Sequence, residues 1–454
     1  MTFKNMGYWM SFFRCFFISN TWTFAKRNYR TMKIDPLLLP PANVRGMQVL
    51  NREAFSKKIL VPYVQLPVGE DMNRAIKALK GYILKLPRLE PVFNTESNKK
   101  GVFLNPSKFS DFSSLIEEDR KILEHSCITE DNFGVKELYI GYEHFKLDDI
   151  LNVILGGDEG CKSYTRVGHI IHLNLKDHLL EYRNLIGQVI LDKIKGIRCV
   201  VNKINTIDNT YRNFQMEIIA GENDMVTTVS ENKCCFTFDF SKVYWNSRLS
   251  TEHERLVQKF EPKSVIYDVC AGVGPFSIPA AKLKNCEVIA NDLNPESVKW
   301  LSENVVKNKV SQKIKINNLD GSVFLRTVFK EEFLKKSETV SFKSHIVMNL
   351  PAMAVEFLPT FQGIFAGATI KDDIEMPIVH VYTFVKGDSD YLCQAVKLVE
   401  AKLGTTLDGN LLESFSVRNV APNKEMIRVS FRLPRSIIYD YESSVEPSEK
   451  KIKV

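Results

Sequence analysis

Polar side chains end four successive apolar runs in the second half of the chain. Asp268 follows SVIY, Asp292 follows CEVIAN, Asp320 follows KIKINNL, and Asn349 follows SHIVM. Because the carboxyl ends of parallel strands meet at one edge of an open α/β sheet, we expect these side chains to surround one ligand. A carboxylate after the second run can hold both hydroxyls of a ribose. The acid after the third run, or its neighbour Gly321, can meet an adenine amino group.

The turn after the first run, DVCAGVGPF at 268–276, argues against two common nucleotide sites. A dinucleotide site needs G-x-G-x-x-G leading straight into a helix. Here Gly272 and Gly274 are followed by Pro275 and Phe276, and no third glycine completes the pattern. The chain has no G-K-[ST] sequence either, which excludes a P-loop. A ligand with ribose, adenine and an ammonium group but no pyrophosphate fits the four strand ends, and we predict S-adenosylmethionine.

The elements that must position these residues alternate between strand and helix patterns. Short apolar runs predict strands, and longer amphipathic stretches such as 295–308 predict the helices between them. The predicted strands cover residues 264–272, 286–294, 313–321, 344–351, 377–386 and 425–434. This alternation predicts an α/β fold over 251–435, a doubly wound, Rossmann-like sheet.

With 454 residues, the chain is too long for a single ordinary domain. Alternating runs and one long helical stretch predict a middle α+β domain at 160–250. A proline-punctuated entry and two short amphipathic stretches predict a small N-terminal domain at 33–150. The charged segment 436–454 is expected to be a disordered tail.

Composition bounds the partners only loosely. The net charge of +7 is compatible with a polyanionic partner without requiring one. Nine cysteines without a C-x-x-C spacing favour a reducing compartment. His169 and His172 lie three residues apart in a predicted strand, so they point to opposite faces, and we predict no metal site. No coiled-coil or clear apolar interface pattern occurs, and we expect a monomer.

The first 31 residues differ from the rest of the chain. They contain five basic residues and no acid, the first acid being Asp35, and this composition predicts a mitochondrial transit peptide. A secretory signal is the alternative, but Arg14 interrupts its apolar run. Met32 could start a second product, so we expect a mitochondrial matrix form and a cytoplasmic or nuclear form. No later segment has an 18-residue apolar run, and we expect no membrane span.

The fourth strand end, NLPA at 349–352, indicates the methyl acceptor. An N-[LP]-P sequence here is typical of methyltransferases that act on planar nitrogens, because the Asn amide and backbone carbonyls can bind a base edge. The motif lacks the aromatic residue found in enzymes that act on the adenine amino group. It therefore favours a ring nitrogen.

Two further stretches are dense in reactive side chains, at 202–222 and 240–257. Each has an ordinary explanation. Arg212 could pair with Glu217 on a strand. Glu252 could be a first-turn acid of a helix capped by Ser250 or Thr251. The aromatic residues at 244 and 245 could simply belong to a core.

Taken together, the motifs resemble the archaeal and eukaryotic tRNA (guanine-37-N1)-methyltransferase family, whose members are class I S-adenosylmethionine-dependent enzymes. The resemblance covers about residues 160–435, with a weaker echo at 34–55. It rests on the motifs NTYRNFQMEIIAGE, VYWNSRLSTEHER, DVCAGVGPFSIPAA, NDLNPESV, NNLDG and NLPAMA in this order. A sister branch uses the same fold to transfer an aminocarboxypropyl group in the wybutosine pathway, and a non-catalytic RNA-binding protein is a further alternative.

The resemblance implies a role for each matching residue. Arg212, Glu252 and Asn349 stand at catalytic positions, with Glu252 as general base, and Tyr244 and Arg248 at substrate-binding positions. The 33–150 domain is expected to contact tRNA outside the anticodon loop. The positions expected to bind the cofactor are His253, Asp268, Gly272, Gly274, Asp292, Leu293, Asp320, Gly321, Asn349 and Pro351.

These roles suit the chemistry of a guanine ring nitrogen. N1 of guanine carries a proton, so a carboxylate must remove it as the methyl group moves, which contributes ~10²–10⁴-fold. Negative charge then develops on O6, where a guanidinium can stabilise it. This sequence has TEHER where some relatives have T-E-R, so Glu254 is an alternative base to Glu252.

Overall fold

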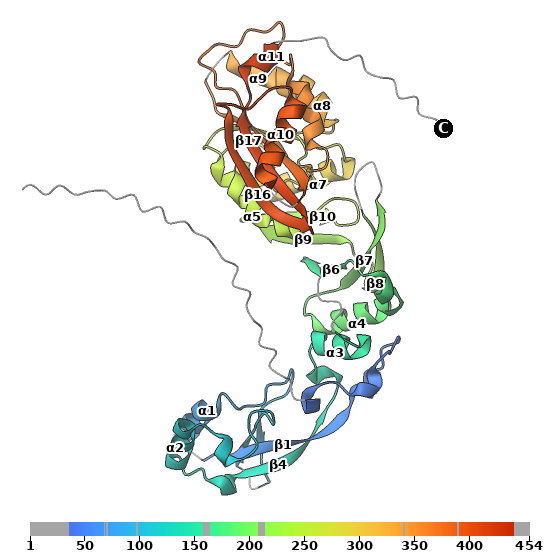
Figure 1. Ribbon diagram of the computed structural model, residues 1–454, viewed down its shortest axis with the longest axis vertical. Helices are drawn as coiled ribbons and strands as arrows, with labels where there is room; N and C mark the ends of the chain where they lie inside the picture. The colour runs from blue at the N-terminus through green and yellow to red at the C-terminus, as the bar shows by residue number, and fades with distance from the viewer. Residues whose placement is uncertain are drawn as a thin grey trace, which may run out of the picture. The chain divides into compact units, whose positions relative to one another are not determined.

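The computed structural model describes residues 36–67, 69, 71–96, 99–157, 164–207, 214–338, 341–387 and 390–439. The chain divides into two compact units, each described here by itself (Figure 1). The first contains Phe55–Phe145 together with the residues before Ala42, and the second contains Ala42–Ala54 and everything after Phe145.

The first unit is a small α+β domain. Its four-stranded antiparallel sheet has the order β2-β3-β1-β4. The core packs apolar residues of β1 and β3 against two short helices, with Val64, Leu79 and Leu123 fully buried. The elements are β1 Lys57–Gln65, α1 Asp71–Leu79, β2 Val92–Asn94, β3 Lys100–Phe103, α2 Glu117–His125 and β4 Phe133–Ile140.

The second unit opens with a helix pair and a four-stranded sheet of order β5-β6-β7-β8, in which β6 and β7 are parallel. Helix α4 packs closely on β8, because a Cβ at Gly187 would lie 2.9 Å from the Ala220 side chain. The elements are α3 Leu147–Leu155, β5 Thr165–Val167, β6 Ile170–Leu173, α4 Arg183–Lys193, β7 Cys199–Ile207 and β8 Phe214–Gly221.

A seven-stranded sheet follows in this unit, in the order β13-β12-β11-β14-β15-β17-β16. The first five strands are parallel, and β17 runs antiparallel to both of its neighbours. The predicted doubly wound fold is thus confirmed, although β16 was not predicted. The strands are β11 Val265–Asp268, β12 Glu287–Asn291, β13 Ile314–Asn317, β14 Ser344–Met348, β15 Ile378–Lys386, β16 Leu411–Ala421 and β17 Lys424–Arg432.

Helices cover both faces of this sheet. Pro295 begins α7 directly after the capping side chain of Asn294, as the helix pattern predicted. Within the described ranges, none of the helices is both long and apolar enough to cross a membrane. The helices are α5 Ser250–Lys259, α6 Ser277–Leu283, α7 Pro295–Lys307, α8 Gly321–Phe324, α9 Lys330–Ser337, α10 Tyr391–Leu403 and α11 Arg435–Tyr439, with a π-helical turn at Leu325–Phe329 and a 3-10 helix at Ala354–Phe361.

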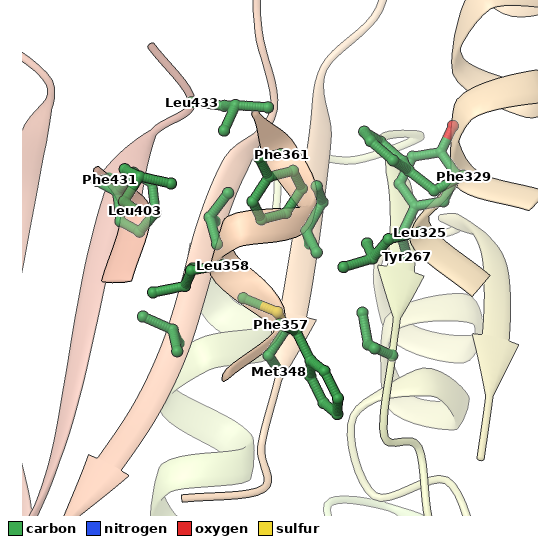
Figure 2. Close-up of a cluster of buried hydrophobic side chains, with 14 of the residues drawn as sticks. Tyr267, Leu325, Phe329, Met348, Phe357, Leu358, Phe361, Leu403, Phe431 and Leu433 are labelled. Atoms are coloured by element: carbon green, nitrogen blue, oxygen red, sulfur yellow. The ribbon is translucent and has the colours of Figure 1, made fainter. Parts of the chain in front are cut away.

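Alternate residues of the strands supply two separate cores. On one face, Tyr267 and Met348 pack against aromatic side chains such as Phe329 and Phe361 (Figure 2). On the other face, Val347 and its neighbours pack against α5, α6 and α7. Burial of each large apolar side chain contributes about 1.5–3 kcal/mol, so both faces hold the strand ends rigidly in register.

The hairpin of β9 (Val226–Glu231) and β10 (Cys234–Asp239) belongs to this second core. The backbone N–H of Thr237 donates to the side chain of Asn304 on α7, and that of Cys235 donates to Asn308, the residue that follows the helix. Residues 226–250 were predicted to belong to the middle domain. In the structure they pack on the seven-stranded sheet, because the alternating Phe236 and Phe238 of β10 face its helices.

Candidate active site

One buried asparagine ties three strand ends together. The Nδ2 group of Asn291 donates to the carbonyls of Val269 (3.0 Å) and Leu319 (2.9 Å), and its Oδ1 accepts from the N–H of Leu319 (2.9 Å). The ends of β11, β12 and β13 are therefore joined by a single side chain. The sequence analysis did not select Asn291, although it directly precedes Asp292 at the end of β12.

The glycine turn after β11 is held by the acid after β12. Gly272 and Gly274 have φ angles of +55° and +99°, in the region that favours glycine. The N–H of Gly272 donates to Oδ2 of Asp292 at 2.8 Å. A Cβ at Gly272 would meet nothing within 4 Å, whereas a Cβ at Gly274 would lie 2.7 Å from Leu301. The turn therefore keeps open space on one side and packs tightly on the other.

Asp268, which is fully buried, ends β11. Its Oδ2 accepts a 2.6 Å hydrogen bond from the hydroxyl of Ser277. Burial raises the pKa of Asp268 to about 7; the hydrogen bond from Ser277 opposes the rise, and the negative charge of Asp292 adds to it. The strand end thus carries a carboxyl group that changes charge near neutral pH.

The other predicted cofactor positions surround the same edge. Burial raises the pKa of Asp292, while the N–H groups of Asn294 and Gly272 oppose the rise. Leu293 is 48% exposed beside it. Asp320 is exposed and caps α8 through Ser322.

Gly321 and Asn349 complete this edge. Gly321 leaves room for the ring of Phe357, which a Cβ would approach to 2.8 Å. Asn349 follows the last residue of β14, and the half-buried Pro351 comes two residues later. The Oδ1 atom of Asn349 is buried and has no hydrogen-bond partner. A buried acceptor without a partner is costly, so this atom marks a place where a ligand donor would fit.

The loop before α5 places one aromatic residue outside and one inside. Tyr244 is 53% exposed, and its hydroxyl accepts a bond from Asn246. Trp245 is buried and stacks on Phe238 with ring centroids 4.9 Å apart. The core explanation therefore holds for Trp245 only. Arg248 is exposed, so it and Tyr244 are both accessible to a large substrate.

Glu252 lies in the first turn of α5 and is only 3% exposed. Its Oε1 accepts hydrogen bonds from Nε of Arg428 (2.7 Å) and from the hydroxyl of Tyr382 (2.9 Å). Its Oε2 accepts one from Nη1 of Arg255 (2.8 Å). The predicted caps of this helix were wrong, because α5 begins at Ser250 after Leu249, without a side-chain cap. Glu252 is thus an interior carboxylate with three charge-assisted or hydroxyl donors.

The neighbours of Glu252 on α5 point elsewhere. His253 is buried, with Nδ1 2.6 Å from Oε1 of Glu231 and its ring edge against Phe276 of the glycine turn. His253 therefore packs against the glycine turn through Phe276. Glu254 is exposed and lies beside Leu283 at the far end of α6.

Arg212 falls outside the described residues. Glu217, which was suggested above as a surface partner of Arg212, pairs with Arg183 at 2.8 Å. The described part of the chain brings no three His, Cys, Asp or Glu side chains together as a metal site would require.

The strand order, the glycine turn and the acids after β12 and β13 define a class I methyltransferase domain. Comparison with known proteins identifies its family. The model described as the TRM5/TYW2 methyltransferase domain matches residues 227–402, and the TYW2 N-terminal domain model matches residues 147–224. The first of these begins at the β9–β10 hairpin, in agreement with the packing of that hairpin.

Relatives that match most of the chain indicate the same family. The chain is 47% identical over 409 residues to the tRNA (guanine(37)-N(1))-methyltransferase of Drosophila pseudoobscura pseudoobscura, covering 88% of this chain and 91% of that protein. It is 44% identical over 409 residues to the human protein of the same name, covering 89% and 79%. Trm5b from Pyrococcus abyssi aligns with a TM-score of 0.55 and 25% identity, over 82% of this chain and 98% of that one. The protein therefore belongs to the tRNA (guanine(37)-N(1))-methyltransferase family, as its motifs predicted.

The cofactor of this methyltransferase domain is S-adenosylmethionine. The residues present fit it: the unpartnered Oδ1 of Asn349, the open side of Gly272 and the acids at 292 and 320 line one sheet edge. When bound, the cofactor supplies an electrophilic methyl group. The protein's own contribution is to hold the acceptor in line with it and to remove a proton.

Proposed function

We propose that this protein transfers the methyl group of S-adenosylmethionine to N1 of guanosine 37 in tRNA, the nucleotide next to the anticodon. The observation that carries the proposal is the arrangement of Asn349 and Glu252. Met348 pairs with Val381, so Asn349 and Tyr382 are adjacent one residue later along β14 and β15. The hydroxyl of Tyr382 in turn contacts Glu252. The amide of Asn349 and the carboxylate of Glu252 are thus related through Tyr382, which is adjacent to the first and bonded to the second.

Glu252 is the proposed general base. A carboxylate oxygen has two lone pairs, so Oε1 is saturated by Arg428 and Tyr382, whereas Oε2 keeps one lone pair. The N1 proton would therefore arrive at Oε2. Because Glu252 is buried, the half-exposed Arg255 must swing aside as the base enters. Proton removal of this kind contributes ~10²–10⁴-fold to the rate.

Asn349 and Arg212 would contact the guanine while Glu252 removes its proton. The unpartnered Oδ1 of Asn349 can accept a hydrogen bond from an N–H group of guanine. By resemblance Arg212 would stabilise the negative charge on O6, worth roughly 3–4 kcal/mol by analogy with one oxyanion donor. The target base must leave the stack of the anticodon loop to reach this edge, as enzymes that modify bases require.

The test is a methyl-transfer assay with radiolabelled cofactor on tRNA transcripts that carry G or A at position 37. We expect label on the G37 transcript only, with activity lost in Glu252→Gln and Arg212→Ala. Glu254→Gln is the matched control, because Glu254 is an exposed acid on the same helix. Loss in Glu254→Gln with activity kept in Glu252→Gln would transfer the role of base to Glu254.

Other outcomes identify the alternatives. A product in which the tRNA gains the mass of an aminocarboxypropyl group instead of the mass of a methyl group would indicate the wybutosine branch. Cofactor binding without product on any tRNA would indicate a non-catalytic RNA-binding protein. Either result would overturn the proposed reaction while leaving the fold unchanged.

The finer proposals rest on the sequence. We propose that the first unit contacts tRNA outside the anticodon loop, and that the protein acts as a monomer. We also propose that residues 1–31 direct one form to the mitochondrial matrix, while a product beginning at Met32 stays in the cytoplasm or nucleus. Deletion of the first unit should weaken tRNA binding without affecting cofactor binding. A single product of one length in every compartment would contradict the two-form proposal.

A further inference from the structure

A row of polar side chains lies between α5 and the sheet. Tyr382 on β15 and Arg428 on β17 are direct cross-strand partners, and Glu252 on α5 bonds to both. All three are 3% exposed or less. Such a row stands out beside the apolar side chains of this face, because burial of charge costs free energy unless the groups are paired.

Arg428 is the centre of this row. Besides Glu252, its guanidinium contacts Oγ of Ser430 (2.7 Å) and Oε2 of Glu413 (3.0 Å) through Nη1. Its Nη2 is buried without a hydrogen-bond partner. A buried ion pair with an unsatisfied donor is weak evidence for a stabilising role, since an apolar residue of similar volume often replaces such a pair without loss. The arrangement is better explained by what it does to Glu252.

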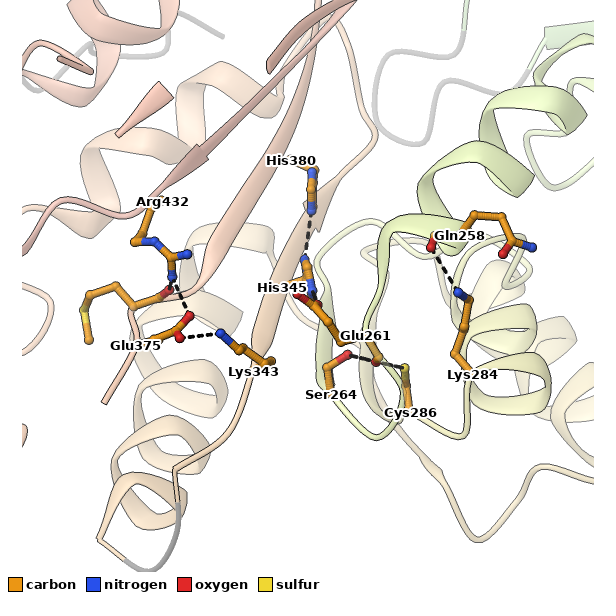
Figure 3. Close-up of polar contacts among 11 residues, drawn as sticks. Gln258, Glu261, Ser264, Lys284, Cys286, Lys343, His345, Glu375, His380 and Arg432 are labelled. Carbon is orange, nitrogen blue, oxygen red and sulfur yellow. Dashed lines mark hydrogen bonds and ion pairs between the residues drawn. The ribbon is translucent and has the colours of Figure 1, made fainter. Parts of the chain in front are cut away.

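The other end of the row fixes Arg428 without adding charge. The hydroxyl of Ser430 contacts Nδ1 of His380, whose Nε2 lies 3.0 Å from Nδ1 of His345. Nε2 of His345 lies 2.8 Å from the exposed Glu261 (Figure 3). Burial lowers the pKa values of both histidines, and the pKa of His380 falls well below its usual range. The imidazoles are therefore neutral, so the charge of Arg428 is balanced by Glu252 and Glu413.

We propose that Arg428 and Tyr382 are positioning residues for methyl transfer, which hold the Glu252 carboxylate in place and direct its Oε2 toward the guanine. The proposal rests on the assignment of Glu252 as general base. Arg428 and Tyr382 occupy both lone pairs of Oε1, so only Oε2 remains to take the proton. The guanidinium 2.7 Å from Oε1 and the Tyr382 hydroxyl 2.9 Å from it hold the carboxylate in one orientation.

The test compares two conservative variants with two matched controls. Tyr382→Phe removes one hydroxyl from the row, and Tyr267→Phe removes one from an equally buried tyrosine on the other face of the sheet, whose hydroxyl has no partner. Arg428→Lys keeps the charge but loses the planar fork. Arg432→Lys does the same on the same strand, where Arg432 pairs with Glu375 (Figure 3).

Single-turnover rates at saturating tRNA and cofactor are measured from pH 5.5 to 9, with cofactor affinity and melting temperature alongside. We expect the rate to fall ~10-fold in Tyr382→Phe and ~10²-fold in Arg428→Lys, part of the whole contribution of a base. KM for tRNA and the cofactor affinity should stay within about 2-fold of wild type, because both side chains are fully buried. Both controls should keep the wild-type rate and profile.

The outcomes separate this proposal from the proposed function. If Glu252→Gln is inactive on G37 tRNA but Tyr382→Phe keeps the wild-type rate and profile, the positioning role is overturned and the base assignment stands. If Glu252→Gln keeps the wild-type rate, both the base assignment and the positioning role fail. If Arg428→Lys loses cofactor affinity through misfolding, Tyr382→Phe decides, because it changes no charge.

Discussion

Replacing Asp268 with asparagine should stabilise the ligand-free protein at alkaline pH. Burial raises the pKa of Asp268 from 3.8 to about 7. The unfolded chain therefore loses this proton about three pH units below the folded protein, so wild-type stability falls as the pH rises from 3.8 to about 7. At 1.36 kcal/mol per unit, the full cost is about 4 kcal/mol above pH 7. Asparagine does not ionise, and its amide oxygen can still accept the bond from Ser277.

Urea unfolding of wild type and Asp268→Asn at pH 5 and pH 8.5 measures this effect. The advantage of the variant should grow by about 3 kcal/mol between the two pH values, since at pH 5 only the first part of the cost has appeared. Asp320→Asn is the control, because Asp320 is an exposed helix cap and asparagine caps helices equally well. An advantage that grows by less than about 1 kcal/mol would refute the assigned burial of this charge.

Three further substitutions test the frame of the site and the four-stranded sheet that contains β6. Gly321→Ala places a Cβ 2.8 Å from the ring of Phe357. We expect the free energy of unfolding in urea to fall by about 1–3 kcal/mol and cofactor binding to weaken. Gly81→Ala is the control and should show neither effect, because no atom lies within 4 Å of its Cβ. Asn291→Ala removes three buried hydrogen bonds and should cost about 2–4 kcal/mol of unfolding free energy; a loss below about 0.5 kcal/mol would contradict its role at the strand ends. Burial lowers the pKa of His172 to about 4, so between pH 6.5 and pH 4 a proton binds mainly to the unfolded chain. The free energy of unfolding of the wild type should therefore fall by about 3 kcal/mol as the pH drops to 4. His172→Phe should flatten this part of the plot of unfolding free energy against pH, and an unchanged slope would exclude the effect.

The ligand edge of the sheet could be predicted because its signals are local. Each strand that ends there is a short apolar run followed at once by a polar residue, and parallel strands bring such ends together. Asp268 and Asn349 were selected on this basis, and both carry buried oxygens without hydrogen-bond partners. Asn291 was missed because its role depends on carbonyls in two other strands, which no pattern within β12 announces.

The edge of the seven-stranded sheet that is formed by β16 was harder to predict. Strand β16 has the sequence LLESFSVRNVA and is half-exposed, so its polar and apolar residues do not form the buried run that marked the other strands. Its pairing with β17 contains three register shifts, which also break a period of two. The position of the β9–β10 hairpin depended on tertiary contacts in the same way.

The role of Glu252 shows most clearly where local reasoning ends. As a first-turn acid its interaction with the helix dipole is worth about 0.3–1 kcal/mol, which does not offset the several kcal/mol needed to bury a carboxylate. The offset comes from Arg428, which lies 176 residues away in the sequence and on the last strand but one of the sheet order. Stability measurements on Glu252 variants alone therefore cannot separate a structural acid from a base, since either would need Arg428. Only the rate of methyl transfer distinguishes them, because loss of the Tyr382 hydroxyl would not change that rate if Glu252 were only a structural acid.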